Sequence, residues 1–336
     1  MITINRRRVI GLGAVVLSLF LLAEIVARLV AANLPTPLEW SSDEAQVKFD
    51  DIRARLTDRP PAVVFVGSSI MDAAVDADAF ARLEGTGRPG YNAALLGSPM
   101  DMIATWTTKV VVPTVRPSVV VVGVSCREVN GREPEQQAIT EEFEASPALR
   151  RLLGTDTVLD RLDRDIGRFS YLVRYRSVFR QPRNLLGRDR RVGTRLAVSA
   201  SGRNTAFDDL DYPPADRLTD VLRPGAITLF ELGQDELRSL RDLVTDLRSQ
   251  GIGVLVISMP ITADFVAWMP YGRRDHDACV GAIKGVTESA GGLHRDAGIW
   301  ERKLFADPIH VNRSGAERVT ALAASAVRAM SRAGGG

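Results

Sequence analysis

Three runs of apolar, mostly β-branched residues constrain the fold of this chain more than any other feature. They cover positions 62–66, 118–124 and 253–258, and apolar residues follow one another in them without alternation. A strand with one solvent-facing side alternates apolar and polar residues, so continuous runs indicate strands buried on both faces. Segments of helical periodicity lie between the runs, most clearly at 233–251. Strands that alternate with helices predict an α/β fold with a parallel sheet between helical layers.

The N-terminal segment combines a basic cluster with a long apolar stretch. Arg6, Arg7 and Arg8 precede a stretch from position 9 to 32 that only Glu24 and Arg28 interrupt with charge. At about 1.5 Å per residue, a helix over this stretch is roughly long enough to cross the ~30 Å core of a bilayer. Glu24 and Arg28 are one helical turn apart and can pair near the outer interface.

The position of the basic cluster predicts the topology of the chain. Arginines on the N-terminal side of a span favour a cytoplasmic N-terminus, which leaves the rest of the chain outside the cytoplasm. We therefore expect 1–34 to be a basic stretch with a single-pass anchor in the cell membrane. Small residues at 30–33 leave open cleavage as a signal peptide, although the apolar stretch is long for one. Residues 35–60 are expected to be a linker or a leading helix, and 61–333 the main domain.

Composition excludes some classes of partner and leaves the cysteines open. The chain has 43 Lys and Arg against 41 Asp and Glu, a balance that gives no case for nucleic-acid binding. Cys126 and Cys279 form no C-x-x-C pair; they could form one disulfide or remain two buried thiols, and we favour the thiols. Together with the three histidines they show no metal-ligand spacing, so we predict no metal and no cofactor.

Positions 127–224 interrupt the alternation of strands and helices. This stretch contains helical-looking segments and an arginine-rich run at 168–195. An insertion after a strand's carboxyl end lies over the ligand face of an open sheet. It is predicted either to be a helical excursion with a solvated basic face or a cap that shapes a substrate cleft and contacts an anionic lipid or glycan.

Three residues far apart in the chain could form a catalytic group. Ser69 directly follows a buried strand on a glycine turn, while Asp307 and His310 lie three residues apart just before the last helix. A carboxylate that accepts a hydrogen bond from one imidazole nitrogen leaves the other nitrogen free as a base. The chain order Ser, Asp, His occurs in acyl-transfer triads, but the G-x-S-x-G elbow is absent because Met71 stands two positions after Ser69. A hydrogen-bonded loop pair is the alternative for Asp307 and His310.

Four short motifs, in order, resemble those of the SGNH or GDSL-like hydrolases. Gly-Ser-Ser at 67–69 resembles the first block, "YNAALLGSP" at 91–99 the second, "VVVVGVSCRE" at 119–128 the third, and Asp-Pro-Ile-His at 307–310 the fifth. The likeness extends from position 62 to the last helix, without the insertion. It implies a three-layer α/β/α, flavodoxin-like domain with an acyl-ester site.

The resemblance implies a role for each matched residue. Ser69 would be the nucleophile, His310 the general base and later acid, and Asp307 the group that orients it. Backbone N–H groups of Ser69 and Gly97 would hold the oxyanion, and Ser68 would support the turn.

The third block departs from the family pattern. Gly-x-Asn is common there, with the Asn side chain completing the oxyanion hole, whereas this chain has Ser125 in the last position. Ser125 is the candidate third donor, although its hydroxyl is shorter. Arg127 could substitute, or the hole could have two donors.

Membrane-anchored relatives that act on cell-envelope polymers, in teichoic-acid D-alanylation and polysaccharide O-acylation, also carry a Gly-Ser-Ser block. With the anchor, this likeness implies an extracytoplasmic serine esterase or O-acyltransferase for acyl, acetyl-like esters of an envelope glycan or lipid. One alternative is a non-catalytic or weakly catalytic accessory module that partners a multi-pass membrane acyltransferase. Another is a secreted esterase for small diffusible esters.

Three other polar residues receive structural interpretations. His276 is expected on the surface, and His294 at a strand end or in a loop. Asp72 is expected to be a carboxylate at the start of a helix.

Overall fold

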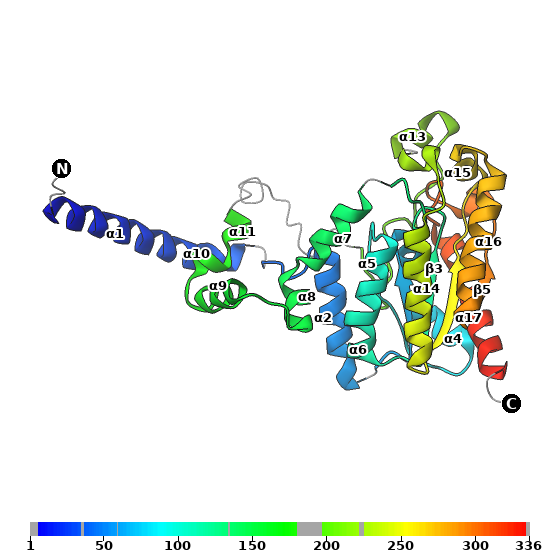
Figure 1. Cartoon of the computed structure of the whole chain (residues 1–336), viewed down its shortest axis with the longest axis horizontal. Coiled ribbons are helices and arrows are strands. Elements are labelled where there is room, and N and C mark those ends of the chain that lie inside the picture. The colour runs from blue at the N-terminus through cyan, green and yellow to red at the C-terminus, as the bar shows by residue number, and fades with distance from the viewer. Residues whose placement is uncertain are drawn as a thin grey trace. The chain divides into compact units, whose positions relative to one another are not determined.

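The computed structural model describes residues 6–34, 37–58, 60–133, 135–179, 197–221 and 225–333. The chain divides into two compact units (Figure 1). The first unit consists of Met1–Glu39 and Leu153–Arg195, and the second of Trp40–Leu152 and Leu196–Gly336. The insertion predicted at 127–224 is therefore shared between the two units.

A five-stranded parallel sheet forms the centre of the second unit within the described residues. Its strands are β1 (Val63–Gly67), β2 (Gly90–Asn92), β3 (Val119–Val124), β4 (Gly253–Ser258) and β5 (Leu293–Asp296). Their order, β2-β1-β3-β4-β5, is that of doubly wound flavodoxin-like sheets. The predicted α/β fold with a parallel sheet is confirmed.

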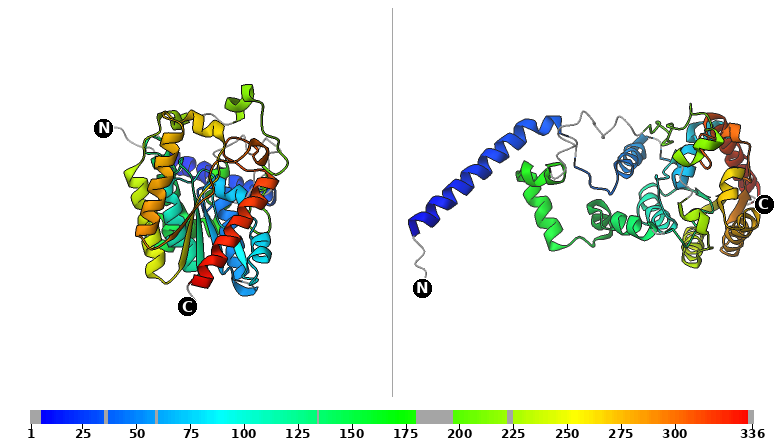
Figure 2. Two further views of the ribbon diagram at one scale, coloured as in Figure 1. Left: turned by 90° about the vertical axis from the view of Figure 1, so that its right-hand side faces the viewer. Right: turned by 90° about the horizontal axis from the view of Figure 1, so that it is seen from above.

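The three predicted runs form the three central strands of this sheet. Val63 of β1 pairs with Val119 of β3, which pairs with Gly253 of β4. Every residue of β1 and β3 is buried. Figure 2 shows why: helices cover both faces of the sheet, so neither face of a central strand meets water.

The helices of the second unit form the two outer layers. α4 and α17 pack against each other, while α5, α14 and α16 are neighbours in series (Figure 2). The helices and helical turns are α2 (Asp43–Asp58), α3 (Ser69–Ala74), α4 (Ala77–Glu84), α5 (Met100–Thr105), the π-helix η2 (Trp106–Val111), α6 (Val112–Val115), α7 (Gln136–Glu144), α8 (Pro147–Leu153), η3 (Ala215–Arg217), α13 (Leu218–Val221), η4 (Gly225–Leu229), α14 (Gln234–Ser249), α15 (Ala263–Trp268), α16 (Arg273–Ser289), η5 (Arg302–Leu304) and α17 (Arg313–Ala333).

Helix α14 forms where the periodicity predicts it. Leu237, Leu240, Leu243 and Leu247 share its buried face. Gly251 follows the helix at φ 76°, a left-handed conformation that suits glycine at a helix end.

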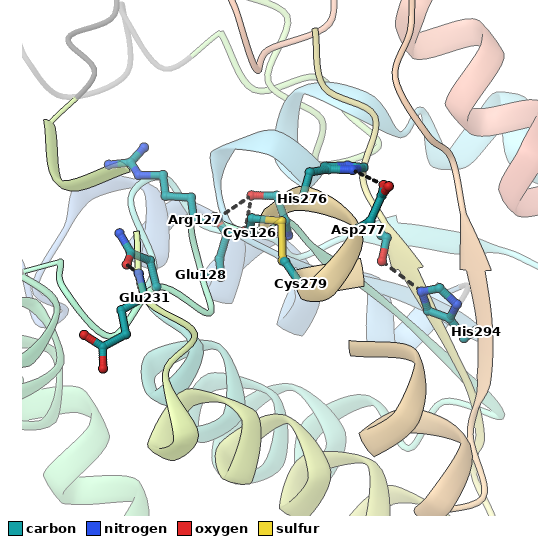
Figure 3. Close-up of a disulfide and its surroundings, with 11 residues drawn as sticks. Cys126, Arg127, Glu128, Glu231, His276, Asp277, Cys279 and His294 are labelled. Atoms are coloured by element: carbon teal, nitrogen blue, oxygen red, sulfur yellow. Dashed lines mark hydrogen bonds and ion pairs between the residues drawn. A yellow bond between two sulfur atoms is a disulfide. The ribbon is translucent and has the colours of Figure 1, made fainter. Parts of the chain in front are cut away.

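The two cysteines form a disulfide, so the expectation of two thiols is wrong. Cys126 follows β3 and Cys279 lies in α16, with their Cα atoms 5.9 Å apart (Figure 3). The parallel order brings the carboxyl end of β3 beside the region between β4 and β5. Nothing in the spacing of two cysteines 153 residues apart reveals this proximity.

Two of the histidines are structural. His276, expected on the surface, is buried in α16, and its Nδ1 lies 3.2 Å from a carboxylate oxygen of Asp277 (Figure 3). His294, in β5, is buried with Nε2 2.8 Å from the Ser258 hydroxyl. Burial lowers the pKa of His294, which favours its neutral form.

The first unit is all-helical where it is described. It contains α1 (Arg6–Val30), η1 (Ala31–Asn33), α9 (Val158–Phe169), α10 (Tyr171–Arg174) and α11 (Arg176–Phe179). Gly11–Asn33 is long and apolar enough to cross a membrane, and the mean hydropathy of an 18-residue window within it reaches 2.3. The arginine-rich part of the insertion at 180–196 lies outside the described residues.

Candidate active site

The turn between β1 and α3 presents Ser69 at the carboxyl edge of the sheet. Ser68 is the N-cap of α3, and its side-chain oxygen accepts a hydrogen bond from the Ile70 N–H at 3.4 Å. Gly67 has φ 154°, and a Cβ there would lie 2.7 Å from both the Gly123 carbonyl oxygen and the Met71 Cβ. Glycine is therefore required for this tight turn, and Ser69 becomes the first residue of the helix.

The structure brings the three predicted triad residues together. His310 Nε2 lies 2.9 Å from the Ser69 hydroxyl, and its Nδ1 lies 2.6 Å from Oδ2 of Asp307. All three side chains are buried. With Nδ1–H donated to the carboxylate, Nε2 is free to accept the Ser69 proton, which is the arrangement of a nucleophile, base and orienting acid.

Asp307 is held rigidly by its own loop. Its Oδ1 accepts the backbone N–H groups of Ile309 at 2.9 Å and His310 at 2.8 Å. Burial by itself would raise the pKa of Asp307, but the hydrogen bonds from the His310 ring and from these two N–H groups hold it below its usual value. The carboxylate is therefore ionised at neutral pH and can stabilise an imidazolium.

Phe207 packs against the imidazole of His310. Nothing in the sequence indicated this contact. The Phe207 ring stacks on His310 with the centroids 4.3 Å apart and the planes 10° from parallel. Its neighbour Asp208 is fixed by a buried ion pair with Arg203 and by its carbonyl oxygen, which accepts the Arg313 N–H at 3.3 Å. The insertion at 127–224 thus contacts His310 through Phe207, and whether it caps a substrate cleft or is a helical excursion stays a prediction.

Gly97 lies in a small pocket next to the nucleophile turn. The pocket is lined by Ser68, Gly97, Ser98, Arg127 and Gln136, among others. Gly97 has φ 67°, so the loop after β2 needs glycine at this point. Its N–H stays a predicted oxyanion donor.

Ser125 does not provide a third donor in this structure. Its hydroxyl donates to Oε2 of Glu128 at 2.7 Å, and its N–H donates to the same oxygen at 2.7 Å. A hydroxyl has one proton, so Ser125 cannot also donate to a substrate oxygen while this bond lasts. Figure 3 shows Arg127 and Glu128 in this turn after β3.

A buried ionic cluster behind the site was also missed. Lys48 of α2 is fully buried and donates to Asp72 of α3 and to the Ala94 carbonyl, with Nζ 3.1 Å from Glu44 Oε1. Oε2 of Glu44 accepts the Leu96 N–H at 2.6 Å. The cluster therefore joins the nucleophile helix to the loop that carries Gly97, and Asp72 is more than a helix-start carboxylate.

The charges in this cluster are unequal, with two carboxyl groups and one ammonium. Burial, reinforced by the nearby Glu44 carboxyl, raises the pKa of Asp72 well above its usual range despite the attraction of Lys48. Neither here nor elsewhere in the described residues is a group of three or more His, Cys, Asp and Glu side chains placed to hold a metal ion.

Comparison with known proteins finds similar solved structures at low identity. No family model and no curated protein matches the chain. An aryl esterase of M. smegmatis aligns with a TM-score of 0.41 and 10% identity, over 80% of this chain and 99% of that one. Est24, a carbohydrate acetylesterase from Sinorhizobium meliloti, aligns at 0.38 and 12%, over 80% and 99%. An acetyl xylan esterase from Butyrivibrio proteoclasticus aligns at 0.36 and 8%, over 81% and 64%. Scores and identities this low do not bear on what the chain acts on.

Proposed function

We propose that this protein is a membrane-anchored, extracytoplasmic serine esterase or O-acyltransferase. Its substrate would be a small acyl ester, acetyl-like, on a cell-envelope glycan or lipid. The observation that carries the proposal is the continuous hydrogen-bonded path from the Ser69 hydroxyl through His310 to Asp307. Ser69 lies 241 residues before His310, and Asp307 lies 3 residues before it. A buried hydrogen-bonded path that joins these three groups suits nucleophilic catalysis.

The proposed reaction proceeds through an acyl-enzyme. Ser69 Oγ transfers its proton to His310 Nε2 and attacks the ester carbonyl, whose oxygen becomes negatively charged. The N–H groups of Ser69 and Gly97 stabilise that charge, each contributing about 10²–10³ in rate. Collapse expels the alcohol, which takes the proton from His310. Water or an acceptor hydroxyl then attacks the acyl-Ser69 ester by the reverse sequence, and Ser69 recovers its proton.

Two features support a location outside the cytoplasm. The disulfide of Cys126 and Cys279 suits an oxidising compartment. The apolar helix over Gly11–Asn33, preceded by arginines at 6–8, suits a span with a cytoplasmic N-terminus. An anchor of this kind would hold the catalytic domain next to envelope polymers and lipids.

The accessory-module alternative rests on one observation. The hydroxyl of Ser125 is occupied by Glu128, which leaves two backbone donors for the oxyanion. An SGNH-like domain with a weak oxyanion hole could bind an acyl acceptor for a multi-pass acyltransferase without turning it over.

The deciding experiment treats the purified full chain with a fluorophosphonate probe and with p-nitrophenyl acetate. Wild type should be labelled and active, and Ser69→Ala should lose labelling and on the order of 10⁴ or more in kcat. Ser68→Ala is the matched control, because it removes a hydroxyl from the same turn and should still be labelled. An inert, unlabelled wild type with intact secondary structure would favour the accessory module. Equal turnover by Ser69→Ala would exclude the triad mechanism.

A further inference from the structure

Helix α9 (Val158–Phe169) of the first unit has an uncovered apolar face. None of its residues is buried. The exposed apolar side chains are those of Val158 (77%), Leu159 (74%), Leu162 (53%), Ile166 (42%) and Phe169 (77%). Their spacing of one, four, eight and eleven residues from Val158 places them on one side of the helix. A face of this kind on a soluble helix would normally pack against a core.

The helix is stabilised by local polar contacts and does not depend on covering that face. Thr157 and Asp160 form a capping box at its start, and Asp156 pairs with Arg164 at 3.1 Å. Asp165, at the edge of the apolar face, pairs with Arg168 at 3.2 Å. The apolar face is therefore presented as a formed surface, flanked by charged residues.

Residues 169–172, at the junction of α9 and α10, are hydrogen-bonded to the apolar helix α1. Glu24 of α1 accepts hydrogen bonds from the Ser170 hydroxyl at 2.9 Å, from the Tyr171 N–H at 2.8 Å and from the Leu172 N–H at 3.1 Å. Arg28 pairs with Glu24 at 2.9 Å and donates to the Phe169 carbonyl oxygen. Glu24 thus caps α10 and fixes the end of α9 at one level along α1.

The depth of Glu24 below the headgroups matches the depth at which interfacial helices lie. If Arg28 reaches the headgroups, Glu24 lies four residues deeper, which is about 6 Å at 1.5 Å per residue. Amphipathic helices in the membrane plane bury their apolar face about 5–10 Å into the boundary between headgroups and acyl chains. Tyr171 and Tyr175 stack beside Arg28, whose guanidinium lies 5.1 Å from the Tyr171 ring centroid. Tyrosines are enriched at this depth.

We propose that α9 is a second membrane-attachment element, which lies in the plane of the outer leaflet with its apolar face in lipid. The occupant is a lipid surface because Glu24 attaches the end of α9 to α1, a helix whose own apolar side chains, such as Ile25 and Leu29, are exposed. The inference rests on the proposed placement of α1 as a transmembrane span. It assigns residues 153–179 of the insertion a function in holding the chain at the bilayer.

The test uses the full-length protein in phosphatidylcholine–phosphatidylglycerol vesicles. Leu162→Cys is labelled with the fluorophore NBD, and nitroxide lipids carry the quencher either near the glycerol or near the chain end. The native cysteines do not compete, because they form a disulfide. Arg168→Cys is the matched control on the polar side of α9, where the wild-type side chain is 69% exposed. Leu17→Cys reports on the span, and Leu159→Cys repeats the measurement on the same apolar face.

The expected result is quenching at Leu162→Cys and Leu159→Cys that is at least about twofold stronger with the shallow nitroxide than with the deep one. Arg168→Cys should be unquenched, and Leu17→Cys should be quenched more by the deep nitroxide. Quenching at Leu17→Cys without quenching at either α9 position overturns the inference and leaves the span intact. Blue-shifted but unquenched emission from α9 also overturns it, since a second copy or another protein surface then covers the face.

An unquenched Leu17→Cys would overturn both the span and the inference. Hydrolysis of p-nitrophenyl acetate is measured on the same samples. If hydrolysis persists while quenching fails, the membrane placement is wrong and the proposed chemistry stands. If quenching is as expected but hydrolysis is absent, the proposed chemistry is wrong and the membrane placement stands.

Discussion

The hydroxyl of Ser125, the candidate third oxyanion donor, donates to the Glu128 carboxylate at 2.7 Å. This bond assigns Ser125 to the turn after β3. In the proposed mechanism, the backbone N–H groups of Ser69 and Gly97 are then the donors left for the oxyanion.

Ser125→Ala should therefore change kcat for p-nitrophenyl acetate by less than about threefold. Removal of a true oxyanion donor costs about 10²–10³ in kcat. The Ser125 N–H still reaches Glu128 in the variant, so the turn should persist. A loss of 10² or more with an unchanged circular dichroism spectrum would show that the hydroxyl reorients toward substrate.

Asp307→Asn should lower kcat by a factor on the order of 10⁴ and leave KM nearly unchanged. The amide can keep one contact with the imidazole but cannot hold Nδ1–H as a carboxylate does, and it stabilises no imidazolium. Steady-state kinetics at pH 7 provide the measurement. A loss below tenfold would indicate that Asp307 is only a loop-stabilising residue.

The same substitution has a pH-dependent effect on stability. The pKa of Asp307 is below its usual value in the folded chain, so its contribution to stability is present above the pKa of the unfolded chain and is lost as pH falls through the folded value. The difference in unfolding free energy between wild type and Asp307→Asn should be constant from about pH 5 to 7 and shrink below about pH 4. Urea unfolding across this range measures it, and a difference that grows on acidification would contradict the prediction.

Phe207→Ala should reduce kcat by roughly 2- to 10-fold with a smaller effect on KM. An aromatic stacking contact contributes about 0.5–1.5 kcal/mol, and here it restrains the ring of His310. Phe207→Tyr keeps the ring and should retain wild-type kcat. If the Tyr variant loses as much kcat as the Ala variant, stacking is not the cause.

The sequence predicts the sheet because residues 63–67 and 119–124 are buried on both faces and show it in their composition. It also predicts Ser69, because this residue directly follows a buried strand at the carboxyl edge of the sheet. Asp307 and His310 are predicted because they lie three residues apart just before the last helix. Phe207 and Lys48 could not be found in this way. Each reaches the site through a contact between segments distant in the chain, and neither belongs to a periodic pattern or a motif.

The disulfide should contribute substantially to stability because it closes a long loop. Its cysteines are 153 residues apart, and the chain-entropy treatment gives about 5 kcal/mol for a loop of this size. Dithiothreitol should therefore lower the urea midpoint of the wild type. The Cys126→Ala, Cys279→Ala double variant should start lower and be insensitive to the reductant. Equal midpoints with and without reductant in the wild type would mean that the bond adds no stability.

Lys48→Met should destabilise the second unit by about 3–5 kcal/mol, since it leaves Asp72 and Glu44 buried without their cation. Combining it with Asp72→Asn and Glu44→Gln removes the uncompensated charge, so the triple variant should be more stable than Lys48→Met alone. Urea unfolding compares the three proteins. The Glu44 carboxylate also accepts the Leu96 N–H, next to Gly97. The triple variant loses this carboxylate, so its kcat should stay below that of the wild type even though its stability recovers. Full recovery of both stability and kcat would show that the cluster stabilises the fold without positioning the loop that carries Gly97.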